Sequence, residues 1–124
     1  MLALPFFRRD TPALRGRRVT LRLPQLSDHA EWAALRRESR AFLEPWEPQW
    51  SRDELERTSW RQRVRRYRED YAAGSAIAFL IFENEEGHLI GGITIGNIRY
   101  GVSQSAQIGY WMGEPHAGKG FMQD

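Results

Sequence analysis

The sequence predicts a single α/β (α+β) domain in which helices flank a mixed, mainly antiparallel sheet. Three observations support this prediction. The chain has 124 residues, which is room for one domain and little else. Hydrophobic residues make up 41% and charged residues 27%, as in globular rather than disordered chains. The apolar positions follow a strand pattern, then a helical pattern twice, then a strand pattern three times.

Residues 17–23 are predicted to form the first strand. Apolar side chains stand there at every second position, as in a strand with one buried face; they are Val19, Leu21 and Leu23. Residues 1–16 hold two prolines and a glycine in a stretch of mixed polarity, so an irregular leader is predicted there. The domain is assigned to residues 17–124.

Two helices are predicted next. Ser27 is a suitable N-cap for the first, which is expected to run to about Ser39. Residues 42–50 contain two prolines, so a turn-rich connection is predicted there. Ser51 is then expected to cap a longer helix, with Glu54 completing a capping box.

The longer helix has a face that is predicted to enter the core. Its members recur at spacings of four, three and four; they are Trp60, Val64, Tyr67 and Tyr71. Gly74 is expected to end the helix. Three strands are predicted to follow, over residues 76–82, 88–98 and 104–112, separated by turns that each hold a glycine.

The composition excludes several classes of function. There is no cysteine, which excludes disulfide, thiol-nucleophile and thiolate–metal chemistry. The three histidines have no metal-ligand spacing, so no metal is expected. No apolar run approaches the ~20 residues of a membrane span, and residues 2–7 are too short for the core of a signal peptide. A cytoplasmic protein is therefore expected.

The basic residues are almost all arginine, since Lys119 is the only lysine among 18. Arginine suits phosphate and carboxylate groups, and five tryptophans beside an arginine-rich helix would suit RNA. However, acidic residues are interleaved along that helix and the net charge is only +2. Direct nucleic-acid binding is therefore not expected, although a non-catalytic module associated with the ribosome or with RNA stays an alternative.

The chemically most informative stretch is residues 108–122. The last predicted strand runs there into a turn in which Gly118 and Gly120 flank Lys119. Glycines let backbone amides approach a ligand, and amides gathered where a helix begins form an anion site suited to phosphate or pyrophosphate. Residues 113–119 also fit the start of a P-loop. Gly120 then stands where the Mg²⁺-binding hydroxyl belongs, so a nucleotide hydrolase is disfavoured.

The same stretch resembles the GNAT acetyltransferase superfamily, whose acetyl-CoA motif is written Q/R-x-x-G-x-G/A after a central strand. More narrowly, it is similar to the branch of ribosomal-protein-alanine N-acetyltransferases of the RimJ/RimL type. Three segments are similar in sequence to members of that branch, namely residues 19–23, 38–48 and 108–122. The first and last motif positions depart from the family pattern, because they hold Ala117 and Met122.

The resemblance implies a reaction that uses acetyl-CoA. It places the acetyl-pantetheine arm along Tyr110, Trp111 and Met112, with an amide near Met112 as the donor to the thioester carbonyl. It also places Trp46 and Trp50 near the acceptor amine. The loop expected to hold the CoA pyrophosphate consists of Ala117, Gly118, Lys119, Gly120, Phe121 and Met122.

The nearby acids receive no catalytic role. Glu44 and Glu47 flank Trp46 and are interpreted as surface acids, while Glu114 is interpreted as a turn residue. In the family the general base and acid commonly come from the C-terminal half of the fold, which this chain is not expected to contain. The catalytic residues therefore stay unknown, and the isolated chain could be inactive while its parent is an enzyme.

The resemblance favours direct acetyl transfer to the N-terminal α-amine of a ribosomal protein. Such an amine is a suitable nucleophile because its pKa of about 8 leaves a useful neutral fraction at neutral pH, unlike lysine at about 10.4. Acetylation of a small-molecule amine, such as a polyamine or an amino sugar, is the alternative within the fold. The last predicted strand is expected to form an open sheet edge, which predicts self-association into oligomers.

Overall fold

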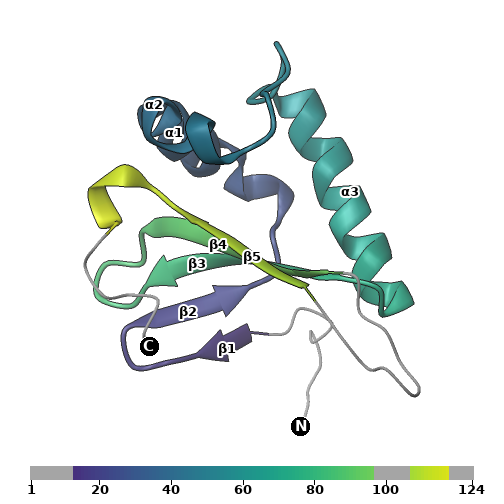
Figure 1. Ribbon diagram of the computed structural model, residues 1–124. Helices are drawn as coiled ribbons and strands as arrows, with labels where there is room; N and C mark the ends of the chain where they lie inside the picture. Colours follow the sequence, from purple (N-terminus) through teal and green to yellow (C-terminus); the bar gives the residue numbers. More distant parts are fainter. Residues whose placement is uncertain (1–12, 97–106, 118–124) are drawn as a thin grey trace, which may run out of the picture.

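The computed structural model describes residues 13–96 and 107–117 (Figure 1). Within these residues no helix is long and apolar enough to cross a membrane. The helices and strands are, in chain order, β1 Ala13–Arg15, β2 Val19–Arg22, η1 Leu26–Asp28, α1 His29–Glu38, α2 Arg40–Leu43, η2 Glu44–Trp46, α3 Arg57–Ala73, β3 Ile77–Glu83, β4 Leu89–Gly96, β5 Gln107–Met112 and η3 Glu114–His116, where η denotes a 3-10 helix.

The strands form one sheet in the order β1-β2-β3-β4-β5, and each neighbouring pair is antiparallel. The helices α1, α2 and α3 lie together on one side of this sheet (Figure 1). The predicted α/β (α+β) class with an antiparallel sheet and flanking helices is confirmed. Within the described residues β5 is an edge strand, as expected, while self-association through that edge stays a prediction.

The strand β1 lies in the segment that was expected to be irregular. Leu14 is paired with Leu21 of β2, and the register extends one residue to either side. All three residues of β1 are exposed, so the pairing depends on backbone hydrogen bonds rather than on a buried face. That is why no alternation of apolar residues predicts it.

The helix α1 begins at His29 rather than directly after Ser27, because Asp28 anchors this segment instead. The buried Asp28 carboxylate accepts the Gln25 N–H at 2.8 Å. It also forms a two-pronged ion pair with Arg22, with N–O distances of 2.9 and 2.7 Å. Ser27 lies within η1. The ion pair therefore joins β2 to the start of α1.

The predicted start of the long helix is wrong by five residues, since the N-cap is Glu56 rather than Ser51 and α3 begins at Arg57. The Ser51 hydroxyl donates to the Asp53 carboxylate at 2.9 Å, so it is engaged within the turn rather than accepting the N–H groups of a helix. The Leu55 carbonyl is hydrogen-bonded to Nε2 of His29 at 2.8 Å. These side-chain contacts hold residues 51–56 in turns, so the local capping pattern does not start a helix at Ser51.

Apolar side chains cover both faces of the sheet, as the alternation along β3 and β4 requires. On the helix side lie Trp32, Ala33, Leu35, Trp60, Val64, Leu80 and Leu89. On the other side lie Val19, Ile81, Ile90 and Met112. Of the predicted stripe on α3, Trp60 and Val64 are buried whereas Tyr71 is exposed. Gly74 ends α3 in the left-handed conformation, with φ at 71°, as predicted.

Three glycines let β4, β5 and α1 approach one another closely. A Cβ atom added at Gly91 would collide with the Trp111 carbonyl oxygen. One added at Gly92 would lie 2.5 Å from Nε1 of Trp111, and one at Gly113 would lie 2.5 Å from Cδ1 of Leu35. The Trp111 indole therefore lies against the backbone of β4, and the end of β5 packs directly on α1.

We expect Gly113→Ala to destabilise the chain by about 1–3 kcal/mol, because the added methyl group overpacks the contact with Leu35. The φ of Gly113 is −62°, so backbone strain does not contribute. Gly109→Ala, within β5, is the matched control, since a Cβ there meets nothing within 4 Å. Urea denaturation of both variants gives the comparison, and equal stabilities would contradict the expected clash.

Candidate functional site

The outer edge of β5 presents backbone groups that no other strand among the described residues uses. The Gly113 N–H donates to the Ile90 carbonyl at 2.8 Å, so these two residues form a hydrogen-bonded pair of the β4–β5 ladder. Because hydrogen-bonded and non-hydrogen-bonded pairs alternate along an antiparallel ladder, the N–H and C=O groups of Tyr110 and Met112 point away from β4. β5 ends the strand order of the described residues. These groups can therefore pair with an extended ligand.

The chain that leaves β5 is held against α1. The Ser39 hydroxyl, which is fully buried, accepts the Glu114 N–H at 2.9 Å. A single turn follows, in which the Ala117 N–H donates to the Gly113 carbonyl at 3.1 Å. Ala117 packs against the core on the far side of the sheet. The direction in which the chain departs from β5 is thus set by contacts with the helical layer and the core.

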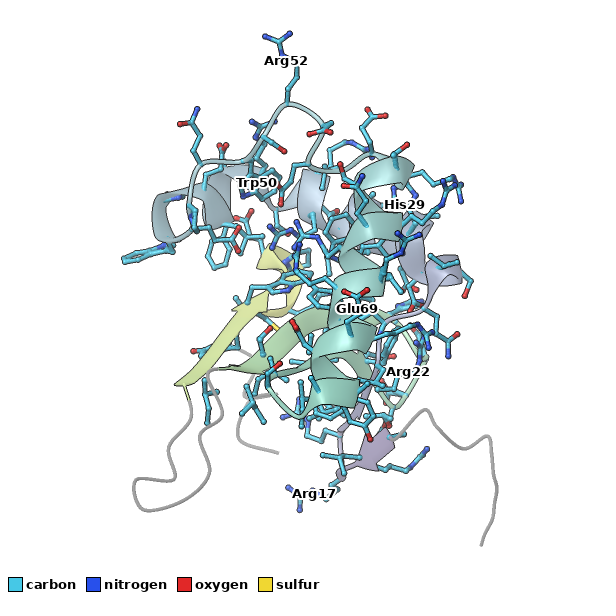
Figure 2. The ribbon with its side chains drawn as sticks, turned by 90° about the vertical axis from the view of Figure 1, so that its right-hand side faces the viewer. Arg17, Arg22, His29, Trp50, Arg52 and Glu69 are labelled. Carbon is cyan, nitrogen blue, oxygen red and sulfur yellow. The ribbon has the colours of Figure 1, made fainter. Side chains whose placement is uncertain are left out.

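A cleft of about 380 Å³ opens on the helix side of the sheet, beside this edge. Its walls come from α1, from the segment between α2 and α3, from α3 and from the three strands β3, β4 and β5. Trp50, labelled in Figure 2, belongs to the segment between the helices. Trp111 contributes the β5 wall. Because Met112 follows Trp111 directly, the cleft and the open edge meet at the end of β5.

Arg36 lies at the centre of the cleft lining, with only 7% of its side chain exposed. Its guanidinium donates to both carboxylate oxygens of Glu47, at 3.0 and 2.8 Å. The guanidinium carbon lies 4.6 Å from the centre of the Trp50 ring and 4.8 Å from that of Trp111. Nε of Arg36 is buried without a hydrogen-bond partner. The Glu47 carboxylate and the two indoles therefore offset the cost of burying this charge.

A second ion pair lies beside the first, since the Glu54 carboxylate is 3.9 Å from the Arg36 guanidinium. Arg63 donates to the Glu54 carboxylate at 2.8 Å and to the Tyr67 hydroxyl at 3.2 Å. Burial lowers the pKa of Arg63, but Tyr67 and Glu54 raise it by more, so the net direction is upward. Arg63 therefore stays charged at any physiological pH. Two arginines and two glutamates face one another, and the charged groups of the lining balance.

Comparison with known proteins then identifies the fold. The family model for the acetyltransferase (GNAT) domain matches residues 18–124. The chain belongs to the GNAT acetyltransferase family. The predicted resemblance is thereby confirmed, and relatives of the predicted branch are among the similar proteins.

This GNAT chain is 30% identical over 118 residues to the [ribosomal protein uS5]-alanine N-acetyltransferase of Escherichia coli (strain K12), covering 94% of this chain and 61% of that protein. It is also 30% identical over 111 residues to the probable N-acetyltransferase YjcK of Bacillus subtilis (strain 168), covering 90% of this chain and 61% of that protein. The chain thus spans about three fifths of the length of these curated relatives, at 61% in both cases.

Solved structures agree with the assignment. The ribosomal-protein-S5-alanine acetyltransferase of Vibrio fischeri superposes with a TM-score of 0.79 at 26% identity, over 90% of this chain and 61% of that chain. RimJ of Mycobacterium smegmatis, solved in complex with CoA-disulfide, gives a TM-score of 0.72 at 32% identity, over 87% of this chain and 53% of that chain.

The GNAT chain distributes the predicted site residues unevenly. Trp50 is 6% exposed and shares the cleft with Trp111, whereas Trp46 is 86% exposed and is not part of the lining. Tyr110 is exposed on the other face of β5, and Met112 is buried. Of the predicted pyrophosphate loop only Ala117 lies within the described residues; the others, which lie outside them, are Gly118, Lys119, Gly120, Phe121 and Met122.

Sequence reasoning missed the charged lining of the cleft. The interpretation of Glu47 as a surface acid is wrong, because Glu47 is bound by Arg36 and by the Trp50 indole N–H at 2.8 Å. Glu44 is exposed and pairs with Arg40 at 3.0 Å, as a surface acid does. Arg36 and Glu47 stand 11 residues apart, a separation that corresponds to no local motif.

We expect Arg36→Met to destabilise the GNAT chain by about 3–5 kcal/mol, because it leaves the Glu47 carboxylate in the cleft without its cation. Arg40→Met is the matched control, since it breaks the exposed pair with Glu44, worth about 0–1 kcal/mol. The stabilities of both variants are measured by urea denaturation, monitored by tryptophan fluorescence. The double variant Arg36→Met/Glu47→Gln should recover part of the loss, and equal effects of the two single variants would contradict a structural role for the buried pair.

Proposed function

We propose that the chain provides the cofactor-binding portion of an acetyl-CoA-dependent N-acetyltransferase, whose acceptor is the N-terminal α-amine of a protein. A ribosomal protein is the favoured acceptor, because the curated relatives of known substrate are ribosomal-protein-alanine acetyltransferases. The observation that carries the proposal is the outward backbone of Tyr110 and Met112 at an open strand edge, next to a cleft of suitable size for a substrate.

The cofactor fits this edge because the pantetheine arm of CoA carries amide groups that pair with a strand as another strand would. In this proposal Tyr110, Trp111 and Met112 hold the arm, and the loop from Ala117 to Met122 holds the pyrophosphate with its backbone amides and Lys119. RimJ of Mycobacterium smegmatis, which resembles the chain at 32% identity, was solved with CoA-disulfide bound. The structure of this relative supports CoA as the ligand that binds the open edge of β5.

The reaction needs little covalent chemistry from the protein. The neutral amine nitrogen bonds to the acetyl carbon, the carbon–sulfur bond breaks, and the sulfur leaves as CoA thiolate. The nitrogen gives up one proton as the amide forms, and the thiolate takes up one proton. Negative charge develops on the thioester oxygen during attack, and the Met112 N–H at the open edge is the donor that we assign to that oxygen. Contacts of Gly113 and Glu114 with α1 keep this edge in place. We assign no general base or acid.

The charge balance of the cleft favours a peptide over a polyamine. A polyamine carries several positive charges and needs uncompensated acids to bind it. Glu47 and Glu54 are already neutralised by Arg36 and Arg63. The cleft is lined by the indoles of Trp50 and Trp111 and by ion-paired side chains, which suits the backbone and first side chains of an extended chain end.

Acetyl-CoA should raise the melting temperature of the chain. At ~100 times its dissociation constant a ligand adds about 2.7 kcal/mol to the stability of the folded state, which is a shift of several degrees in a domain of this size. Differential scanning fluorimetry with acetyl-CoA, with CoA and with free pantetheine measures it. Replacing Gly118 and Gly120 by valine should remove the response to acetyl-CoA, and a chain that does not respond at all would contradict the proposed cofactor site.

The acceptor is tested on the longest available form of the protein. Peptides that begin with alanine should be acetylated at the α-amine, as read by tandem mass spectrometry, while the same peptides with a blocked N-terminus should not react. Spermidine and glucosamine serve as the competing small-molecule amines. Faster acetylation of either small amine than of every alanine peptide would overturn the choice of acceptor and leave the cofactor site intact.

A further inference from the structure

One flank of α3 carries a row of arginines that neither the cleft nor the open edge uses. Arg57, Arg61, Arg65 and Arg68 recur at spacings of four, four and three, so they lie along one side of the helix. All four side chains are exposed. At a rise of 1.5 Å per residue the row is about 16 Å long.

The arginines of the row form no ion pair with acids among the described residues. Within residues 13–96 and 107–117, ion pairs with acids are made by other arginines, namely Arg22, Arg36, Arg40 and Arg63. No ion pair or side-chain hydrogen bond joins any of the four arginines of the row to the described residues. Their charges are therefore available to a partner.

Two acids that precede the row in the sequence are held by other groups, whereas Glu69 lies in the groove beside the row. Asp53 accepts hydrogen bonds from Ser51 and Ser59, which lower its pKa below the usual value. Glu54 is held by Arg63 in the cleft. Helix α3 itself has six arginines and two acidic residues, a net charge of +4. The flank therefore carries one acid, Glu69, beside four arginines, so its charge is predominantly positive.

A shallow groove runs beside the row, between α3 and η1. It is lined by Leu26, Arg61, Val64, Arg65, Arg68 and Glu69. Leu26 is half exposed, and Glu69, labelled on α3 in Figure 2, lies at the rim. The flank thus combines a line of guanidinium groups with a small apolar floor.

We propose that this row docks the sugar–phosphate backbone of an RNA strand. Guanidinium groups form two-pronged hydrogen bonds with phosphates, and a row one residue wide matches a linear polyanion better than a flat surface. A membrane-binding helix needs a row of exposed tryptophan, phenylalanine or leucine, whereas this groove offers Leu26. The inference rests on the proposed function, because a ribosomal protein that serves as the acceptor is a component of an RNA-containing particle.

The test compares two triple variants of equal charge in binding to a fluorescently labelled single-stranded RNA. Arg61→Gln/Arg65→Gln/Arg68→Gln removes most of the row. Its control is Arg17→Gln/Arg37→Gln/Arg52→Gln, which removes three exposed arginines from elsewhere; Arg17 and Arg52 lie at opposite ends of the molecule in Figure 2. Fluorescence anisotropy over a range of salt concentrations gives the affinity and its salt dependence.

We expect the row variant to bind RNA at least tenfold more weakly than the control variant. Its log–log salt slope should be shallower by about two, at ~0.7 per lost phosphate contact. Equal losses in the two variants would overturn the proposal, as would no RNA binding by the unmodified chain. Tighter binding to polyglutamate or to vesicles of anionic phospholipid than to RNA would overturn it in favour of that partner.

The acetyl-CoA response separates this inference from the proposed function. Both triple variants should keep the melting temperature shift with acetyl-CoA, because none of the six arginines lines the cleft or the edge. RNA binding that survives the row variant while the shift persists would refute the docking surface alone. Absence of the shift in the unmodified chain would refute the proposed function, whatever the RNA result.

Discussion

The Arg36–Glu47 ion pair is the constraint on which the geometry of the cleft depends. A buried guanidinium needs a carboxylate, and the nearest one comes from the segment between α2 and α3, which must therefore fold back over α1. Once it does, Trp50 and Trp111 enclose the same cation. The Arg36 guanidinium, carried by α1, thus contacts both the segment between α2 and α3 and the strand β5. The cleft lies between these elements.

The open edge of β5 is kept in place by small residues rather than by charge. Gly91 and Gly92 let β5 and the Trp111 indole come against β4, and Gly113 lets the end of β5 touch Leu35. The buried Ser39 hydroxyl then takes the next backbone amide, that of Glu114. Cleft and edge are therefore positioned by the same helix, α1.

Sequence patterns predicted those features whose cause is local. The apolar face around Trp60 and Val64, the end of α3 at Gly74 and the meander of strands follow from periodicity and backbone preference. The Arg36–Glu47 pair and the edge strand β1 had no such signal, because partners distant in sequence or backbone pairing alone create them. Trp50 and Trp111 were placed by family resemblance, and the glycine-rich loop lies outside the described residues.

The strand order also has a kinetic consequence. β3, β4 and β5 pair with their neighbours in the chain, so their hairpins close short loops. The pairing of β2 with β3 joins Val19 to Glu83, and both long helices lie in the loop that it closes. Closing a loop of that length costs more conformational entropy than closing a short one, so the pairing forms more slowly. We expect the meander to form early, and β1 and β2 to complete the sheet only after the helices have packed upon it.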